Sequence, residues 1–175
     1  MKICKYYFFT FLWLLFISAH NCFAQNPEIK RTWHWYFGNN AGIDFSSGTA
    51  VADTNGQVYT SEGCASISDT CGYLLFYTDG KSVWNKNHQL MPNGTGLMGG
   101  INGSSTQAAL ILPEPGSSNL FYVFTVDQYP GTDGMRYTIV DLNLNGGLGD
   151  VDINLKNILL FAPCVERLSA VNHSN

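Results

Sequence analysis

Acidic side chains are the first groups in this sequence whose chemistry suits catalysis. A glycoside hydrolase needs two carboxyl groups about 5–10 Å apart, and the candidates are Asp44, Glu62, Asp79, Asp127 and Asp141. Asp79 and Asp127 directly follow strand-like segments, where a carboxylate commonly accepts hydrogen bonds from the amides of a turn. Both interpretations stay open on sequence alone, and we favour the turn-forming one.

Nucleophilic catalysis and metal binding find little support in the spacing of residues. A Ser or Cys nucleophile needs a base held close to it, but His34, His88 and His173 are scattered and no Gly-x-Ser-x-Gly elbow occurs. Residues 53–56 begin like an EF-hand loop without its later ligands, and paired Cys/His spacing typical of zinc sites is missing. We therefore predict no catalytic residues, no metal and no cofactor.

Aromatic and loop residues are the remaining candidates, and they point to binding. Aromatic side chains supply large contact areas at recognition surfaces, although they also pack between sheets; those of interest are Trp33, Trp35, Trp84, Tyr129 and Tyr137. Tyr129 lies between Gln128 and Pro130, so we expect it to be exposed. The predicted binding loops are residues 93–105 and 128–134, with contacts from Asn93, Asn102, Tyr129 and Asp133.

Short strands are the elements that must position these residues. Segments rich in β-branched and aromatic residues, bounded by Gly, Asn, Asp or Pro, indicate strands at 33–37, 65–68, 73–78, 82–84, 108–112, 120–126, 136–142, 158–161 and 168–171. Turn residues stand at 53–56, 69–72, 79–80, 92–94, 115–116 and 145–147. Because no segment keeps an apolar stripe at helical spacing, we predict an all-β fold.

An internal repeat refines this prediction. Residues 65–84 and 108–142 share one pattern: a strand of small residues, a turn containing Gly, an aromatic strand ending in Asp, and a further strand. The offset of roughly 45 residues is typical of a four-stranded propeller blade. We expect a partial β-propeller of about three four-stranded antiparallel units, as part of a longer protein; a small β-sandwich is the alternative.

The first residues indicate export. Lys2 and Lys5 flank the start of an apolar run at 6–17, and small residues at Cys22 and Ala24 fit a signal-peptidase site. We predict a signal peptide at 1–24, cleaved near Ala24. The run is shorter than the roughly 20 residues that span a bilayer. The mature chain, 25–175, is therefore expected to be secreted or displayed on the cell surface without inserting into the membrane.

Composition narrows the range of partners. Cleavage removes two lysines and no acid, which takes the formal net charge from −4 to −6. A mildly acidic chain lacks the basic clusters that nucleic acid requires, so no nucleic-acid partner is expected. Export permits a disulfide, but the pairing stays open among Cys64, Cys71 and Cys164.

Several motifs, in order along the chain, resemble a known family. They are WYFGNNAGIDF (35–45), SEGCASISD (61–69), LLFYTDG (74–80), VWNKNHQLMPNG (83–94), SSTQA (104–108) and LNGGLGD (144–150). They are similar to the N-terminal region of Bacteroidetes gliding-motility-associated surface proteins, which carry a type IX secretion sorting domain and often Ig-like PKD repeats. The resemblance implies a propeller-like region of a large surface protein, exported by secretion machinery that reads a C-terminal domain not contained in these residues.

The predicted function follows from the repeat, the signal peptide and the resemblance together. We expect a non-enzymatic cell-surface module for adhesion, scaffolding, or recognition of glycans or surface proteins. Two alternatives stay open: an extracellular polysaccharide hydrolase that uses the carboxylates named above, and a structural spacer.

Overall fold

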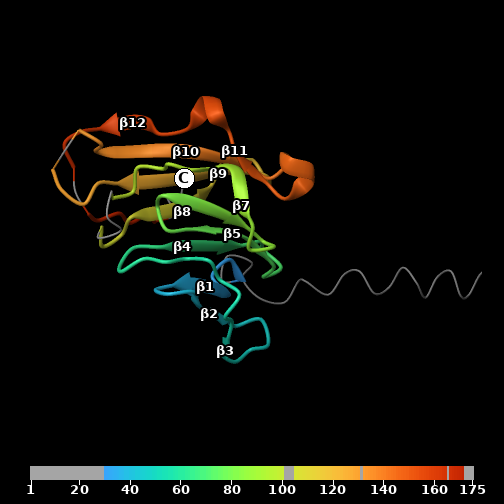
Figure 1. The fold of residues 1–175 in the computed structure, drawn as a ribbon. Helices are drawn as coiled ribbons and strands as arrows, with labels where there is room; N and C mark the ends of the chain where they lie inside the picture. Colours follow the sequence, from blue (N-terminus) through green and yellow to red (C-terminus); the bar gives the residue numbers. More distant parts are fainter. Residues whose placement is uncertain (1–29, 101–104, 131, 165, 172–175) are drawn as a thin grey trace, which may run out of the picture.

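The computed structural model (Figure 1) describes residues 30–100, 105–130, 132–164 and 166–171. Strands and short 3-10 turns make up its regular structure, which confirms the prediction of an all-β fold. The predicted signal peptide at 1–24 and the candidate Asn102 lie outside the described residues.

The strands form three antiparallel sheets. The first sheet contains β1 (His34–Phe37), β2 (Ala41–Asp44) and β3 (Val51–Ala52) in that order. The middle sheet contains β4 (Ala65–Ser68), β5 (Leu74–Thr78), β6 (Ser82–Asn85) and β7 (Leu90–Thr95), again in chain order. Both sheets are therefore simple meanders, in which each strand pairs with the next one along the chain.

The third sheet has five strands. It begins as a meander of β8 (Ala109–Pro113), β9 (Leu120–Val126) and β10 (Met135–Asp141). Two short strands, β11 (Asp150–Val151) and β12 (Ile158–Phe161), then both pair with β10. The 3-10 turns η2 (Asn145–Gly147) and η3 (Ile153–Leu155) come just before β11 and β12.

Side chains close the turns of the middle sheet. Asp69, Asp79 and Asn85 each accept hydrogen bonds from two backbone amides two to four residues further along, at 2.7–3.1 Å. Asp and Asn favour turns through this type of local bond. The hairpins are therefore specified by residues that stand within the turns themselves.

The sheets stack face to face, with the middle sheet buried on both sides (Figure 1). One interface, between the middle and third sheets, is apolar and includes the edge-to-face pair Phe76–Phe121, with ring centroids 5.5 Å apart. The other interface, between the first and middle sheets, centres on Tyr36, Val58 and Tyr77. The initial strands also lie side by side, β1 against β4 and β4 against β8.

Two predicted elements are wrong. Residues 92–94 lie within strand β7 instead of forming a turn. The Pro is tolerated because β7 is an edge strand of its sheet. Gly94 is needed for close approach, since a Cβ there would lie 2.7 Å from the Val83 carbonyl oxygen. The predicted strand at 168–171 is absent: these residues have no regular structure.

The expected count of four strands in each unit is met by the middle sheet alone. The first sheet has three strands and the third has five. Within the described residues the sheets remain three separate sheets and do not close into a barrel or a ring.

Candidate functional site

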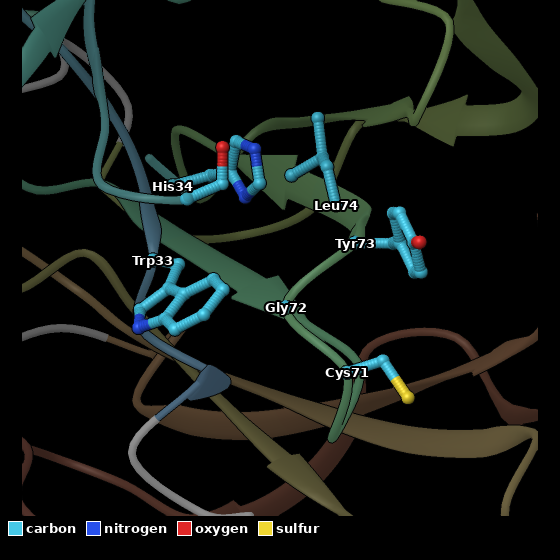
Figure 2. Close-up of a pocket in the computed structure, with 7 residues that line it drawn as sticks. Trp33, His34, Cys71, Gly72, Tyr73 and Leu74 are labelled. Atoms are coloured by element: carbon cyan, nitrogen blue, oxygen red, sulfur yellow. The ribbon is translucent and has the colours of Figure 1, made fainter. Parts of the chain in front are cut away.

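A pocket of about 260 Å³ opens where the first and middle sheets meet. Figure 2 shows Trp33, just before β1, and His34, its first residue, on one side, and residues 71–74, from the β4–β5 turn and the start of β5, on the other. Its lining consists of Trp33, His34, Ser46, Cys71, Gly72, Tyr73 and Leu74. Two aromatic side chains thus stand beside several polar groups.

The β4–β5 turn positions the two aromatic residues of the lining, Trp33 and Tyr73. Gly72 has a positive φ of 95°, and a Cβ at this position would lie 2.2 Å from Cε3 of Trp33. Both facts require glycine, because other residues are strained at this φ and would displace the indole ring. Tyr73 follows immediately, and its side chain is 73% exposed. The indole is packed against the turn, whereas the exposed phenol ring projects away from Trp33 and His34 (Figure 2).

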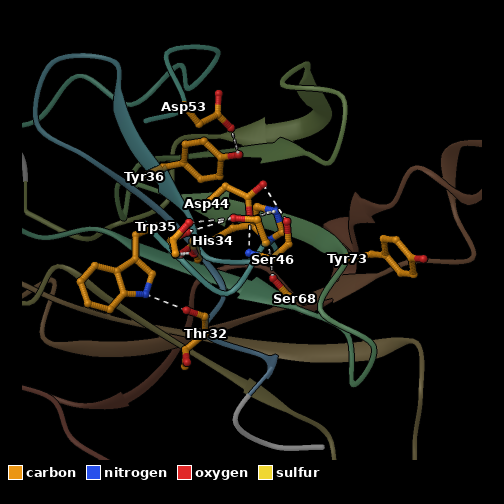
Figure 3. A network of polar contacts seen from close by, with 12 residues as sticks. Thr32, His34, Trp35, Tyr36, Asp44, Ser46, Asp53, Ser68 and Tyr73 are labelled. Atoms are coloured by element: carbon orange, nitrogen blue, oxygen red, sulfur yellow. Dashed lines mark hydrogen bonds and ion pairs between the residues drawn. The ribbon is translucent and has the colours of Figure 1, made fainter. Parts of the chain in front are cut away.

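A hydrogen-bond network centred on His34 forms the polar side of the pocket (Figure 3). The Nδ1 atom of His34 lies 3.0 Å from Ser68 Oγ, and Nε2 lies 3.4 Å from Asp44 Oδ1. Ser46 donates to the same carboxylate from its amide at 2.7 Å and from its hydroxyl at 2.9 Å. Ser66 Oγ donates to the His34 carbonyl oxygen. The imidazole therefore ties β2 of the first sheet to β4 of the middle sheet.

The charge state of Asp44 follows from these contacts. Burial alone would raise the pKa of Asp44, but the hydrogen bonds from Ser46 and the neighbouring His34 outweigh it and lower this pKa below its ordinary value. The carboxylate therefore stays ionised at neutral pH and remains an acceptor for Ser46.

The Ser68–His34–Asp44 arrangement has the composition of a catalytic triad but not its accessibility. A nucleophilic hydroxyl must reach the substrate. Ser68 is completely buried, with a relative exposure of 0%. We therefore assign these three residues a structural role, in which His34 links Asp44 of β2 to Ser68 of β4.

A second polar–aromatic cluster lies in the same interface between the first and middle sheets. The rings of Tyr36 and Tyr77 stack with centroids 4.4 Å apart. The Tyr36 hydroxyl donates to Asp53 Oδ2 at 2.7 Å, and the Tyr77 hydroxyl lies 3.1 Å from His88 Nδ1. Burial is the main cause that raises the pKa of Tyr77 to about 12. Both phenols are thus neutral at physiological pH and serve as hydrogen-bonding groups.

The carboxylates proposed for hydrolysis are mostly occupied by local backbone bonds. Asp79 accepts from the amides of Lys81 and Ser82, as described for the β5–β6 turn. Asp127 and Asp141 accept from the amides of residues 128 and 143 at 2.7 and 2.8 Å. Glu62 Oε2 lies 3.5 Å from Thr106 Oγ1. The two turn amides bound by Asp79 confirm the turn-forming interpretation for this residue, whereas Asp127 accepts from the amide of the adjacent residue.

Of the predicted loop contacts, the three described residues Asn93, Tyr129 and Asp133 are not part of the pocket lining. Asn93 belongs to β7 and donates to Asp150 from its backbone and its side chain, at 2.8 and 2.7 Å, which joins the middle and third sheets. Tyr129 is 67% exposed, as expected. Asp133 is half-buried, and its carbonyl oxygen accepts from Arg136 Nε.

The predicted aromatic patch is divided among different environments. Trp33 alone of its members lines the pocket. Trp35 is 49% exposed, on the face of β1 opposite to the buried Tyr36. Trp84 stacks on Tyr77, and Tyr137 packs edge-on against Tyr122. Tyr73 was not among the predicted contact residues. The signal available for it was its position directly after the predicted turn at 69–72.

Cys64, Cys71 and Cys164 form no disulfide in the structure, and burial raises the pKa of Cys64 and of Cys164. Within the described ranges, no group of three or more His, Cys, Asp or Glu is placed to hold a metal ion. No helix among these residues has the length and apolar character needed to cross a bilayer.

Comparisons of the chain with protein-family models, with curated proteins and with solved structures found no match.

Proposed function

We propose that this chain is a propeller-type module of an exported surface protein and that it recognises glycans through the Trp33–Tyr73 pocket without cleaving them. The observation that carries the proposal is the pocket itself, whose lining combines Trp33 and Tyr73 with polar groups that belong to the hydrogen-bond network of His34. The proposal combines an architecture, a location and a ligand class, each with its own support.

The stacking of the sheets supports the architecture. Propeller blades are meanders packed face to face, with the initial strand of each blade nearest the central channel. Here three meanders stack in chain order, and their initial strands β1, β4 and β8 lie next to one another. A sandwich of two sheets would not place a third sheet on the far side of the middle one.

The chemistry of the pocket supports the ligand class. A sugar ring has apolar faces and a polar rim, so it suits a site with aromatic walls and a few placed polar groups. Tyr73 offers an exposed ring, Trp33 is held in place by Gly72, and Ser46 and His34 supply polar atoms. The volume of about 260 Å³ is near the lower end for small-molecule sites, which favours one sugar unit over a large ligand.

The predicted location makes this ligand class reasonable. The signal-peptide pattern at 1–24 and the resemblance to gliding-motility-associated surface proteins both favour a module outside the cell. Polysaccharides are abundant there, and an adhesive module needs binding without turnover. The hydrolase alternative is weaker, because Asp44, Asp79, Asp127 and Asp141 all accept hydrogen bonds from nearby backbone amides.

A glycan array followed by titration of the strongest ligand tests the proposal. The full chain, produced with export, is compared with Tyr73→Ala and with the matched control Tyr59→Ala, whose ring is 75% exposed but lies outside the pocket. We expect Tyr73→Ala to weaken binding at least about tenfold, as is common for an aromatic anchor, and Tyr59→Ala to leave it unchanged. Equal affinities for the two variants, or release of sugar products, would overturn the proposal.

A further inference from the structure

Asn–Gly pairs are positions at which a polypeptide can modify itself without an enzyme. The backbone nitrogen of the glycine attacks the side-chain carbonyl carbon of the Asn, and glycine permits this because it has no side chain to obstruct the approach and its backbone adopts many conformations. Asn is for this reason a heat-labile residue. Such pairs occur at 55–56, 93–94, 102–103 and 145–146. The pair at 102–103 lies outside the described residues, so the structure can distinguish only the other three.

The Asn93–Gly94 pair is held in place by the contact between the middle and third sheets. Nδ2 of Asn93 donates to Oδ2 of Asp150 at 2.7 Å, and this aspartate is buried. Gly94 is buried within strand β7, and a Cβ on it would lie 2.7 Å from the Val83 carbonyl oxygen. Before the ring could close, the amide group would have to leave Asp150 and the backbone would have to turn within a closely packed strand.

The Asn55–Gly56 pair is held by its neighbours in the first sheet and its loop. Asn55 is exposed, but its backbone amide donates to Asp53 Oδ1 at 2.9 Å and its carbonyl oxygen accepts from Gln57 Nε2 at 2.8 Å. Gly56 is buried, and a Cβ on it would lie 2.6 Å from Cδ1 of Tyr36. Attack by the Gly56 nitrogen therefore requires a packed and hydrogen-bonded backbone to rotate.

The Asn145–Gly146 pair has no such restraints. Both residues are exposed, and a Cβ on Gly146 would meet no atom within 4 Å. Among the described residues, neither the Asn145 side chain nor the Gly146 amide has a hydrogen-bond partner. Gly147 is equally exposed and unobstructed, so two successive glycines leave this backbone free to rotate. The reacting carbon and nitrogen are thus both unengaged, with room to meet.

We propose that Asn145 is a site of spontaneous deamidation. The Gly146 nitrogen attacks Cγ of Asn145, and the new C–N bond closes a succinimide ring. The Cγ–Nδ2 bond breaks, and Nδ2 leaves as ammonia with the proton of the Gly146 amide. Water then opens the ring at either carbonyl carbon and yields aspartate or isoaspartate. Both products add a negative charge to the exposed turn, and isoaspartate also lengthens the main chain ahead of β11, which begins at Asp150.

Peptide mapping by mass spectrometry tests the proposal on the full chain, independently of glycan binding. The folded chain is incubated at mildly alkaline pH in water enriched in heavy oxygen, which labels each deamidated residue because this water opens the ring. We expect Asn145 to be labelled at least about tenfold faster than Asn93 or Asn55, since the restraints on those two raise the barrier to ring closure. Equal rates at Asn145 and Asn93, or no label at Asn145, would overturn the proposal.

Unfolding supplies the matched control. In concentrated urea the three pairs lose their different surroundings, so their rates should become similar and that of Asn145 should change least. Asn145→Gln keeps an amide but needs a larger ring, so it should abolish labelling at this position and leave the rates at Asn93 and Asn55 unchanged. Circular dichroism confirms that this variant is folded. If the rate at Asn145 instead rose at least about tenfold on unfolding, the folded turn would be protecting this residue and the proposal would be wrong.

Discussion

The two faces of the middle sheet differ in kind, although they belong to the same four strands. The face toward the third sheet buries Phe76, Val83 and Met91 against aliphatic and phenyl side chains. The face toward the first sheet buries Tyr77 and Trp84, and the Tyr77 hydroxyl contacts His88 and accepts from the Gln57 amide. One interface is apolar, and the other combines stacked rings with directed hydrogen bonds.

This difference separates the interface that we expect to supply most of the stability from the one beside which we propose binding. An apolar interface stabilises in proportion to the area it buries and imposes little directionality. Hydrogen bonds among buried polar groups fix a unique arrangement, because any other leaves a partner unsatisfied. The pocket lies at the edge of the polar–aromatic interface, where fixed geometry is useful for a ligand. We therefore assign stability mainly to the apolar interface and binding to the other.

The largest expected effect is on the apolar interface. Phe121→Ala should lower the free energy of unfolding by about 3–5 kcal/mol, because it removes a buried ring and leaves a cavity facing Phe76. Urea denaturation followed by circular dichroism measures the change. Tyr129→Ala, at a ring that is 67% exposed, is the control and should change stability by less than about 0.5 kcal/mol. Similar losses for the two variants would refute the assignment.

A smaller effect is expected in the polar–aromatic interface. Tyr36→Phe keeps the ring that stacks on Tyr77 but removes the hydroxyl that donates to Asp53. A hydrogen bond to a charged group contributes about 1.5–3 kcal/mol, so the loss should fall below that of Phe121→Ala. The same denaturation experiment measures it. A loss larger than that of Phe121→Ala would show that the hydrogen bonds, and not apolar burial, dominate stability.

The pH dependence of stability also distinguishes the two interfaces, through the Asp53 carboxylate that accepts from Tyr36. Burial acts to raise the pKa of Asp53, but the hydrogen bonds from Tyr36 and Asn55 outweigh it and lower this pKa below its ordinary value. A lowered folded-state pKa stabilises the fold above the unfolded-state pKa of about 3.9, and this contribution disappears as pH falls through the folded value. The stability difference between wild type and Asp53→Asn should therefore be largest near pH 7 and shrink below about pH 4. The difference between wild type and Phe121→Ala should not follow this trend.

Tyr73→Ala should have the smallest effect on stability and the largest effect on ligand binding at the pocket. Tyr73→Ala should change the free energy of unfolding by less than about 0.5 kcal/mol, because the ring is 73% exposed. Gly72→Ala should be more destabilising, since its Cβ would collide with the Trp33 ring at a positive φ. Thermal unfolding of both variants measures the contrast. If Tyr73→Ala proved the less stable of the two, the phenol would be a packing residue and not an open contact.

The sequence was informative where local chemistry decides structure. The strands at 65–68, 120–126 and 158–161 have the predicted bounds, because Asp69, Asp127 and Asn157 directly adjoin them and mark an end of each. The exposure of Tyr129 also followed from its neighbours Gln128 and Pro130. The turn role of Asp79 was another local inference, and its two backbone hydrogen bonds confirm it.

The remaining features depend on contacts between distant segments. Strands β2 and β7 were missed because Gly42 and Gly94 resemble turn residues but instead allow close approach, to Tyr36 and to the Val83 carbonyl. The pocket was missed because it joins β1 to a turn almost 40 residues later. The predicted contact Asn93 instead binds Asp150, a residue of a different sheet. No local pattern indicates which distant segment a side chain will meet.

Mapping of backbone amide shifts by nuclear magnetic resonance tests the central claim most directly. The strongest glycan from the array is titrated into the labelled chain, and the shifts of all assigned amides are followed. Our account predicts that the largest changes fall at Trp33, Ser46 and the 71–74 segment, which surround the pocket. Changes concentrated at Tyr129 and the rest of the 128–134 loop, with residues 71–74 unaffected, would contradict it.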